Sequence, residues 1–253
     1  MSVEELFEYY VKQAESPFSG WDFSFLAETN RMDTEPLPWS YGSIVMKQKQ
    51  LVDTMLDMGT GGGEFLSMIM PLPENTYATE GYQPNISIAK DRLEPIGVEV
   101  KEVGEDDLLP FQDDQFELVI NRHESFDASE VKRVLKDGGT FVTQQVGGLD
   151  LQRLNIELDA LDQFDYSDWN LKTAIDKLIE AGFSITTSDE AYPVTRLYDI
   201  GAVIYYLKAI PWQINDFSIE KYRDFLFKLH QEIESKGFFD VKAHRFYIIA
   251  QKK

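Results

Sequence analysis

The sequence contains no cysteine among its 253 residues. A disulfide framework, a thiolate zinc site and a cysteine nucleophile are therefore excluded. Long apolar runs are also lacking, because no stretch approaches the roughly 18 apolar residues of a membrane span. The N-terminus has no basic region followed by an apolar run, which is the pattern of a secretory signal. We therefore expect a soluble protein in the cytoplasm.

Positive charge is scarce, since 24 Lys and Arg stand against 44 Asp and Glu, a formal net charge of −20. A nucleic acid or an anionic membrane would meet a repulsive field over most of this surface. We predict a small-molecule partner, with neither nucleic acid nor membrane bound, and we predict no metal site. Apolar residues make up 43% of the chain, enough to build a substantial core.

From residue 51 onward, short apolar runs alternate with helical patterns, which is typical of βα units around a parallel sheet. Seven strands are expected, at 52–58, 77–79, 98–103, 116–120, 140–146, 183–187 and 243–251. Helices are expected between them at 64–70, 84–93, 129–136 and 168–181. The run at 116–120 lacks polar alternation, which favours a strand buried on both faces.

Two further segments fall outside this alternation. Residues 1–50 are predicted to form an N-terminal helical extension, beginning with an amphipathic helix at 3–14. Residues 51–253 hold the main domain. Within it, residues 190–241 are expected to form a cap insertion between strands six and seven, over one end of the sheet. Helical patterns around 197–207 and 218–235 support this interpretation.

The most informative motif is a glycine-rich loop, Asp57-Met-Gly59-Thr60-Gly61-Gly-Gly63, between a buried strand and a helix. Such glycines allow a tight turn and let a ligand approach main-chain N–H groups. A phosphate-binding P-loop needs a Lys-Ser/Thr pair next, but Glu64-Phe65 follows. A dinucleotide fingerprint needs glycine where Glu64 stands, which weakens an NAD(P)-dependent oxidoreductase without excluding it.

The pattern Asp57-x-Gly59-x-Gly61-x-Gly63 resembles motif I of the class I S-adenosylmethionine-dependent methyltransferases. An acid beside the loop suits that cofactor, which carries an ammonium and a sulfonium where a dinucleotide carries phosphates. The resemblance implies S-adenosyl-L-methionine as the cofactor and a binding role for this loop, including Thr60. The alternative is that Asp57 only bonds the N–H groups of its own loop.

The resemblance continues after the second and third strands. Glu80, 23 residues after Asp57, stands where the family has the acid that binds the ribose hydroxyls. A carboxylate suits two adjacent hydroxyls because it accepts two hydrogen bonds. Gly81 follows it, and Tyr82 would lie against the adenine or simply pack. Either Glu105 or Asp106 would accept from the adenine amino group, and the sequence leaves that choice open.

Further along, Arg133-Val-Leu-Lys-Asp-Gly-Gly139 resembles a signature of the family's small-molecule group, the methyltransferase type 11-like enzymes. The resemblance covers about residues 50–187. It implies an α/β fold with a seven-stranded, mostly parallel, Rossmann-like sheet whose last strand is antiparallel. The predicted function is S-adenosylmethionine-dependent methyl transfer to a small-molecule acceptor by in-line displacement. A non-catalytic S-adenosylmethionine-binding protein is the alternative from another class.

The residues directly after the fourth strand are the candidates for chemistry, because ligands sit at the carboxyl ends of parallel strands. Alignment and water exclusion supply most of the rate of methyl transfer, and a base is needed only if the acceptor arrives protonated. His123 is the candidate base, with pocket shaping as the alternative. Asn121 is predicted to orient the acceptor and to contact the cofactor. Arg122 would hold a carboxylate or pair with Glu124.

Overall fold

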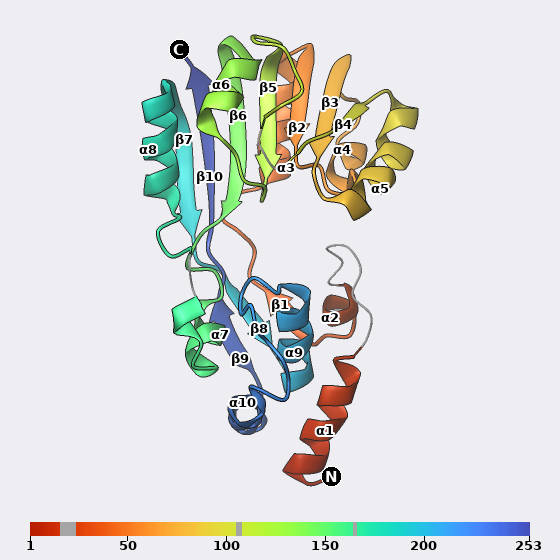
Figure 1. Ribbon diagram of the computed structural model, residues 1–253, viewed down its shortest axis with the longest axis vertical. Coiled ribbons are helices and arrows are strands. Elements are labelled where there is room, and N and C mark those ends of the chain that lie inside the picture. The colour runs from red at the N-terminus through yellow and green to blue at the C-terminus, as the bar shows by residue number, and fades with distance from the viewer. Residues whose placement is uncertain (16–23, 105–107, 164–165) are drawn as a thin grey trace. The chain divides into compact units, whose positions relative to one another are not determined.

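The computed structural model describes residues 1–15, 24–104, 108–163 and 166–253 (Figure 1). They fall into two compact units. The larger unit comprises Pro38–Gly147, Trp169–Ala191 and Arg245–Lys253, and the smaller unit comprises Met1–Leu37, Gly148–Asp168 and Tyr192–His244. Each unit holds one sheet of its own.

The sheet of the larger unit has seven strands in the order β4-β3-β2-β5-β6-β10-β7. They are β2 (Thr54–Met58), β3 (Asn75–Glu80), β4 (Glu99–Glu102), β5 (Phe116–Arg122), β6 (Leu135–Val146), β7 (Phe183–Ala191) and β10 (Arg245–Lys252). Strand β10 runs antiparallel to β6 and β7, whereas β2 to β6 pair in parallel. The predicted mostly parallel α/β sheet is confirmed. Strand order reverses between β2 and β5, where a ligand crevice is expected.

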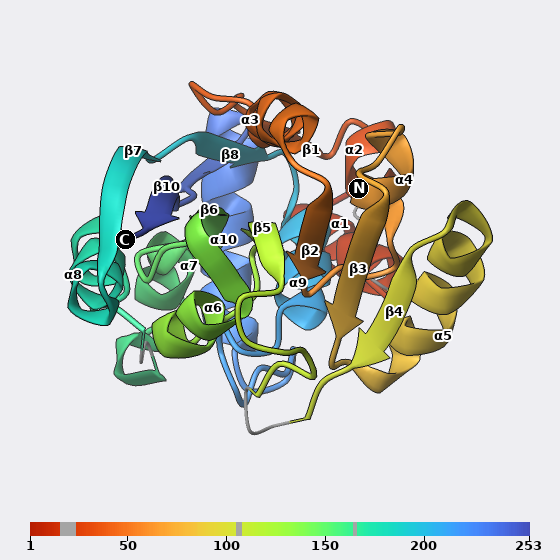
Figure 2. The same ribbon diagram turned by 90° about the horizontal axis from the view of Figure 1, so that it is seen from above.

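Helices cover both faces of this sheet, as Figure 2 shows. They are α3 (Tyr41–Gln48), α4 (Glu64–Met68), α5 (Gln83–Leu93), α6 (Ala128–Val134) and α8 (Leu171–Ala181). Val119 of β5 packs in the core with α6 and α8, and its neighbours Leu118 and Ile120 pack in the core with α3, α4 and α5. All three side chains are fully buried, so the unbroken apolar run of β5 reflects burial on both faces.

Helix α6 ends two residues earlier than expected, at Val134. Its start is sharp because the Asp127 carboxylate accepts from the N–H groups of Ser129 and Glu130, at 2.8 and 2.9 Å. The next residue, Leu135, is already extended and pairs with Phe116 of β5. In the sequence, the Gly138-Gly139 pair after this helix is a typical C-terminal cap signal, but Gly138 instead makes a left-handed turn with φ +75° inside β6. Strand pairing therefore ended the helix before its glycine signal.

The smaller unit contains a three-stranded antiparallel sheet in the order β1-β8-β9. Its strands are β1 (Met32–Thr34), β8 (Val194–Leu197) and β9 (Phe239–Lys242). Its helices are α1 (Val3–Gln13), α2 (Ser24–Glu28), α7 (Gln152–Glu157), α9 (Ile200–Ala209) and α10 (Arg223–Lys236). These elements share one hydrophobic core of their own.

The unit boundaries differ from the expected division at residues 50, 190 and 241. Residues 1–37 pair with the segment expected to be a separate cap, since Asp33 of β1 lies opposite Arg196 of β8. Residues 38–50 belong to the larger unit instead. Strand β8 ends at Leu197, where a helix was expected to begin. Strands β1 and β8 lie some 160 residues apart in the chain, and pairing at that distance leaves no local periodicity in the sequence. The sequence of this unit therefore indicated its helices but not its sheet.

Apolar helices of membrane-spanning length are not found in the described ranges of the chain.

Candidate functional site

The glycine-rich loop connects β2 to α4 with three glycines in left-handed backbone conformation. Their φ angles are +67° at Gly59, +63° at Gly61 and +79° at Gly63, a region that disfavours side chains. A Cβ at Gly63 would lie 2.6 Å from Leu93 Cγ, whereas one at Gly61 would meet nothing within 4 Å. Gly63 therefore lets α4 start against α5, and its predicted cofactor contact stays a prediction.

A pocket of about 220 Å³ opens beside this loop. It is lined by residues 58–59, 79–82, 103–104, 109 and 124–127, which lie at or after the carboxyl ends of β2, β3, β4 and β5. The structure thus brings together four predicted cofactor residues, namely Gly59, Glu80, Gly81 and Tyr82. Glu105 and Asp106 lie outside the described residues. The remaining candidates, which do not line this pocket, are Asp57, Thr60, Gly61, Gly63, Asn121 and His123.

Glu80 ends β3 with a carboxylate that is oriented before any ligand arrives. The residue is 4% exposed, and its Oε1 accepts from the N–H of Tyr82 at 2.7 Å. One carboxylate oxygen is therefore held by the backbone of the following turn, while the group lines the pocket. Tyr82 is 62% exposed, so its side chain is not part of the core. An exposed ring at this mouth is free to lie against a planar group.

Asp57 is buried below the loop at 3% exposure. Burial raises the pKa of its carboxyl group to about 7, although the neighbouring Thr60 hydroxyl and Arg122 guanidinium offset part of this rise. The Thr60 hydroxyl is itself buried and meets no described partner with hydrogen-bond geometry. The N–H groups of Thr60 and Gly63 donate to other atoms of the site, the carbonyls of Thr79 and Thr60. The alternative role of Asp57, bonding the loop's N–H groups, is therefore not observed at these two residues.

Asn121 is fully buried at the end of β5, and only the oxygen of its side-chain amide has hydrogen-bond partners among the described residues. Its Oδ1 accepts from Gln145 Nε2 at 2.6 Å and from Thr143 Oγ1 at 2.9 Å. Its Nδ2 has no hydrogen-bond partner among the described residues. An unpaired buried donor is costly, so this amide is a group that a bound ligand or water would satisfy.

His123 follows β5 in a left-handed conformation with φ +63°. Desolvation, followed by the positive charges of Arg245 and Arg122, lowers the pKa of its imidazole to about 3. The side chain nevertheless keeps an exposed surface, so desolvation contributes less than it would in a sealed site. The two like charges preserve the direction of the shift, and the imidazole is neutral at pH 7.

Arg122 places its guanidinium 5.9 Å from the ring centres of both Tyr41 and Phe65. It makes no ion pair with any described residue, so the interpretation that it pairs with Glu124 is wrong. The Tyr41 hydroxyl beneath it is buried without a described partner, and burial raises its pKa well above the usual value. This edge of the sheet therefore presents a cation held by aromatic rings.

Sequence analysis did not identify the two residues that fix the loop at Leu109, which lines the pocket. Arg133 donates to the carbonyls of Leu109 and Phe111 at 2.9 and 2.8 Å. Its partner Glu130 accepts from the N–H of Leu109 at 3.0 Å, and the two side chains are joined by an ion pair. Arg133 opens the signature Arg133-Val-Leu-Lys-Asp-Gly-Gly139, and the structure shows that it fastens the loop at Leu109.

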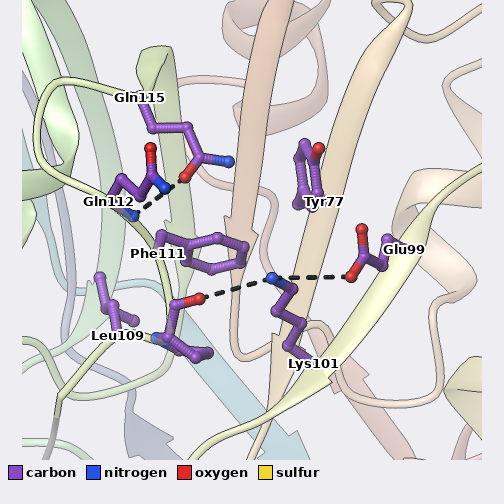
Figure 3. A pocket seen from close by; sticks show the side chains of 8 residues that line it. Tyr77, Glu99, Lys101, Leu109, Phe111, Gln112 and Gln115 are labelled. Carbon is purple, nitrogen blue, oxygen red and sulfur yellow. Dashed lines mark hydrogen bonds and ion pairs between the residues drawn. The ribbon is translucent and has the colours of Figure 1, made fainter.

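A larger hollow of about 540 Å³ lies beside β3 and β4 and shares Leu109 with the pocket (Figure 3). It contains no residue of the glycine loop. Its cation, Lys101, lies 3.6 Å from Glu99 Oε1 and 4.8 Å from the centre of the Phe111 ring. The charge of Lys101 is thus already compensated, and we assign the functional site to the smaller pocket because the predicted residues converge there.

Seven strands in this order, with a glycine loop after β2 and an acid ending β3, define the class I methyltransferase fold. Residues 56–143 match the family model of the methyltransferase domain. This stretch of the chain is therefore similar to the methyltransferase domain, and the fold that the resemblance implied is confirmed. A search of the curated proteins finds no match to the sequence.

Solved structures of similar fold include a candidate methyltransferase from Bacillus halodurans C-125, with 20% identity, a TM-score of 0.55, and coverage of 83% of this chain and 99% of the other. A protein of unknown function from Deinococcus radiodurans R1 has 13% identity and a TM-score of 0.59, over 97% of this chain and 100% of the other. A geranyl diphosphate methyltransferase in complex with GPP and sinefungin has 13% identity and a TM-score of 0.51, over 84% and 78%. At these identities, the likeness concerns the fold.

Proposed function

We propose that the protein transfers the methyl group of S-adenosylmethionine to a small-molecule acceptor. The observation that carries this proposal is the convergence of Gly59 and the oriented Glu80 carboxylate in one pocket. A carboxylate that accepts two hydrogen bonds suits the paired hydroxyls of a ribose. The structural neighbour that binds sinefungin, an analogue of this cofactor, supports the same choice.

Two opposite charges beside the loop suit the amino-acid end of this cofactor. Asp57 pairs with Ile120 across the sheet, and Arg122 stands two residues further along the same strand, so the two side chains share a face. The Asp57 carboxylate would bind an ammonium, and the unpaired Arg122 guanidinium would bind a carboxylate. We infer that this pair, with the unpartnered Thr60 hydroxyl, holds the methionyl end.

When bound, S-adenosylmethionine supplies a methyl group on a positively charged sulfur that needs no further activation. The chain's own contribution is to bind and orient, by in-line alignment of an acceptor near the end of β5. A small-molecule acceptor is favoured over nucleic acid because the net charge of −20 repels a phosphate backbone.

A nicotinamide-dependent oxidoreductase is less well supported. Glu64, in the position of the third fingerprint glycine, begins α4 with its carboxylate paired to Arg92. A pyrophosphate at that helix start would meet a carboxylate where the fingerprint needs a bare backbone. A binding protein without turnover remains the second candidate, because every feature of the pocket concerns the cofactor.

Isothermal titration with S-adenosylhomocysteine and with NAD tests the proposal. We expect saturable binding of S-adenosylhomocysteine and none of NAD. Tight NAD binding without S-adenosylhomocysteine binding would overturn the proposal. Mass spectrometry after incubation with S-adenosylmethionine and an acceptor panel then separates an enzyme from a binding protein, since only the enzyme yields a product heavier by one methylene.

The affinity for S-adenosylhomocysteine should depend on pH through Asp57. In the free protein its pKa is raised to about 7, so below pH 7 the carboxyl group is neutral and attracts an ammonium weakly. Affinity should therefore rise by up to about tenfold per pH unit toward pH 7. It should fall again above about pH 8, where an ordinary α-amino group loses its proton.

Titration calorimetry of the wild type and Asp57→Asn between pH 5.5 and 9 checks this expectation. The variant should bind more weakly and should lose the acidic limb while keeping the alkaline one. Asp91→Asn, at an exposed position of α5, serves as the control and should leave both limbs intact. An acidic limb that persists in Asp57→Asn would assign that ionisation to another group.

A further inference from the structure

Three side chains form a hydrogen-bonded chain at the carboxyl end of β5 and β6, within the larger unit. The indole Nε1 of Trp39 lies 2.8 Å from Gln144 Oε1. The Nε2 of the same amide lies 3.0 Å from His123 Nε2. Gln144 is 3% exposed, and the Trp39 ring packs against Tyr247 with ring centres 5.0 Å apart. Each member of the chain is therefore held in place by the sheet or by a neighbouring ring.

The chemistry of these groups determines the direction of every bond. An indole N–H can only donate, so Gln144 must turn its oxygen toward Trp39. The amide NH₂ then faces His123, and it too can only donate. The imidazole Nε2 must accept, which requires a neutral ring with its proton on Nδ1. Reversing the amide would set its NH₂ against the indole N–H, and protonating Nε2 would set that N–H against the amide NH₂.

Gln144 also forms a hydrogen bond with the main chain of His123. The backbone N–H of His123 donates to the Gln144 carbonyl at 2.7 Å. One residue thus bonds both the main chain and the ring of His123, in a backbone conformation with φ +63° that is sparsely populated. Residues are held in such conformations only where their surroundings specify them, and these positions cluster at functional sites.

We propose that Trp39 and Gln144 are positioning residues that hold His123 as a neutral hydrogen-bond donor through Nδ1–H. His123 then does not act as the general base considered from the sequence, because its basic nitrogen is occupied and the other carries the proton. Nδ1 has no partner among the described residues and is the atom offered to a ligand. This inference deepens the proposed methyl transfer and rests on it only for the identity of that ligand.

The charges around His123 indicate what the donor would meet. Arg122 on β5 and Arg245 on β10 both act on the imidazole as positive charges, and Glu124 follows it in the chain. A fixed N–H donor in this positively charged surrounding suits an oxygen that bears negative charge, and Arg245 remains for that oxygen when Arg122 binds the cofactor carboxylate. We therefore assign to the acceptor a deprotonated oxygen, such as a carboxylate or a phenolate. Such an acceptor needs no base, which agrees with a His123 whose Nε2 already accepts from the Gln144 amide.

A long-range ¹H–¹⁵N correlation spectrum of the full-length protein tests the proposal, because it separates a protonated ring nitrogen from a bare one. The chain has three histidines, and their neighbours predict different tautomers. His244 Nδ1 accepts from the N–H of Leu149, and His230 Nε2 lies 3.1 Å from the carbonyl of Val3, so both should carry the proton on Nε2. His123 alone should carry it on Nδ1 at pH 7.

Two variants test whether Trp39 and Gln144 determine the tautomer of His123. Gln144→Glu replaces the NH₂ by an oxygen that accepts from both neighbours, so the proton should move to Nε2 and the pKa should rise toward about 6.5. Trp39→Phe keeps the packing on Tyr247 but removes the indole N–H, so a population with the proton on Nε2 should appear. Tyr247→Phe retains the ring contact and should leave the His123 signals unchanged. His123→Gln assigns the signals.

The outcomes separate this inference from the proposed function. A wild-type His123 that carries its proton on Nε2, or is doubly protonated at pH 7, would overturn the inference even if S-adenosylhomocysteine binds. A tautomer unchanged in both Gln144→Glu and Trp39→Phe would show that these residues do not determine it. The predicted tautomer together with no S-adenosylhomocysteine binding would overturn the function and leave the positioning of His123 intact.

Discussion

Glu80→Ala is expected to weaken S-adenosylhomocysteine binding by roughly 10- to 150-fold. The variant loses charge-assisted hydrogen bonds to the ribose, worth about 1.5–3 kcal/mol. It also frees the N–H of Tyr82, which Glu80 holds at 2.7 Å, so the turn that shapes the pocket loses its anchor. Isothermal titration of the purified variant measures the change directly.

Two further variants make the Glu80 result specific. Glu80→Gln keeps an oxygen for the Tyr82 N–H and removes only the charge, so its affinity should fall between those of the wild type and the alanine variant. Glu102 is the residue paired with Glu80 on the neighbouring strand, and it is exposed. Glu102→Ala should leave the affinity unchanged. Equal affinities of the wild type and Glu80→Ala would remove Glu80 from the cofactor site.

Gly63→Ala is expected to destabilise the protein by about 2–6 kcal/mol. A left-handed conformation with φ +79° costs a side chain about 1–3 kcal/mol. The added methyl would also lie 2.6 Å from Leu93 Cγ in the buried core, and overpacking of this kind costs about 1–3 kcal/mol more. Urea unfolding followed by tryptophan fluorescence measures the loss in free energy of unfolding.

Gly97→Ala is the matched control for Gly63→Ala. Gly97 has a similar φ of +88°, but a Cβ there would meet nothing within 4 Å. Its loss should be confined to backbone strain, about 1–3 kcal/mol. The difference between the two variants measures the close approach of the loop to α5. Equal losses would contradict a packing role for Gly63 and would favour conformation alone as the reason for glycine there.

The predicted strands and the loop were read correctly because their signals are local. The apolar run at 116–120 becomes β5, buried on both faces, and the glycines after β2 adopt the left-handed conformations that glycine favours. Helix α6 shows where local signals fail. Its Gly138 predicted a later end, but pairing of Leu135 with Phe116 extended the backbone first. Such pairing depends on a distant strand and is invisible to periodicity.

The candidate site divides in the same way. Asp57, Gly59 and Glu80 could be chosen from their spacing, because the carboxyl ends of parallel strands meet at one edge. The partners of His123 could not be chosen, since Trp39 and Gln144 lie 84 and 21 residues away from it and carry no motif. A titratable histidine after a strand suggests a base, whereas only its neighbours reveal which nitrogen holds the proton.

By itself the sequence determined the fold class of the larger unit, the succession of its strands along the chain and the chemistry expected of the glycine loop. Those properties follow from residue types at short spacing, where backbone sterics and side-chain chemistry act without reference to the rest of the chain. The tertiary structure decided that β1 shares a sheet with β8 and β9, that Arg122 lies over two rings with no ion pair to a described residue, and that His123 faces an amide. Each of these depends on contacts between residues far apart in the chain, which exist only once the strands have paired.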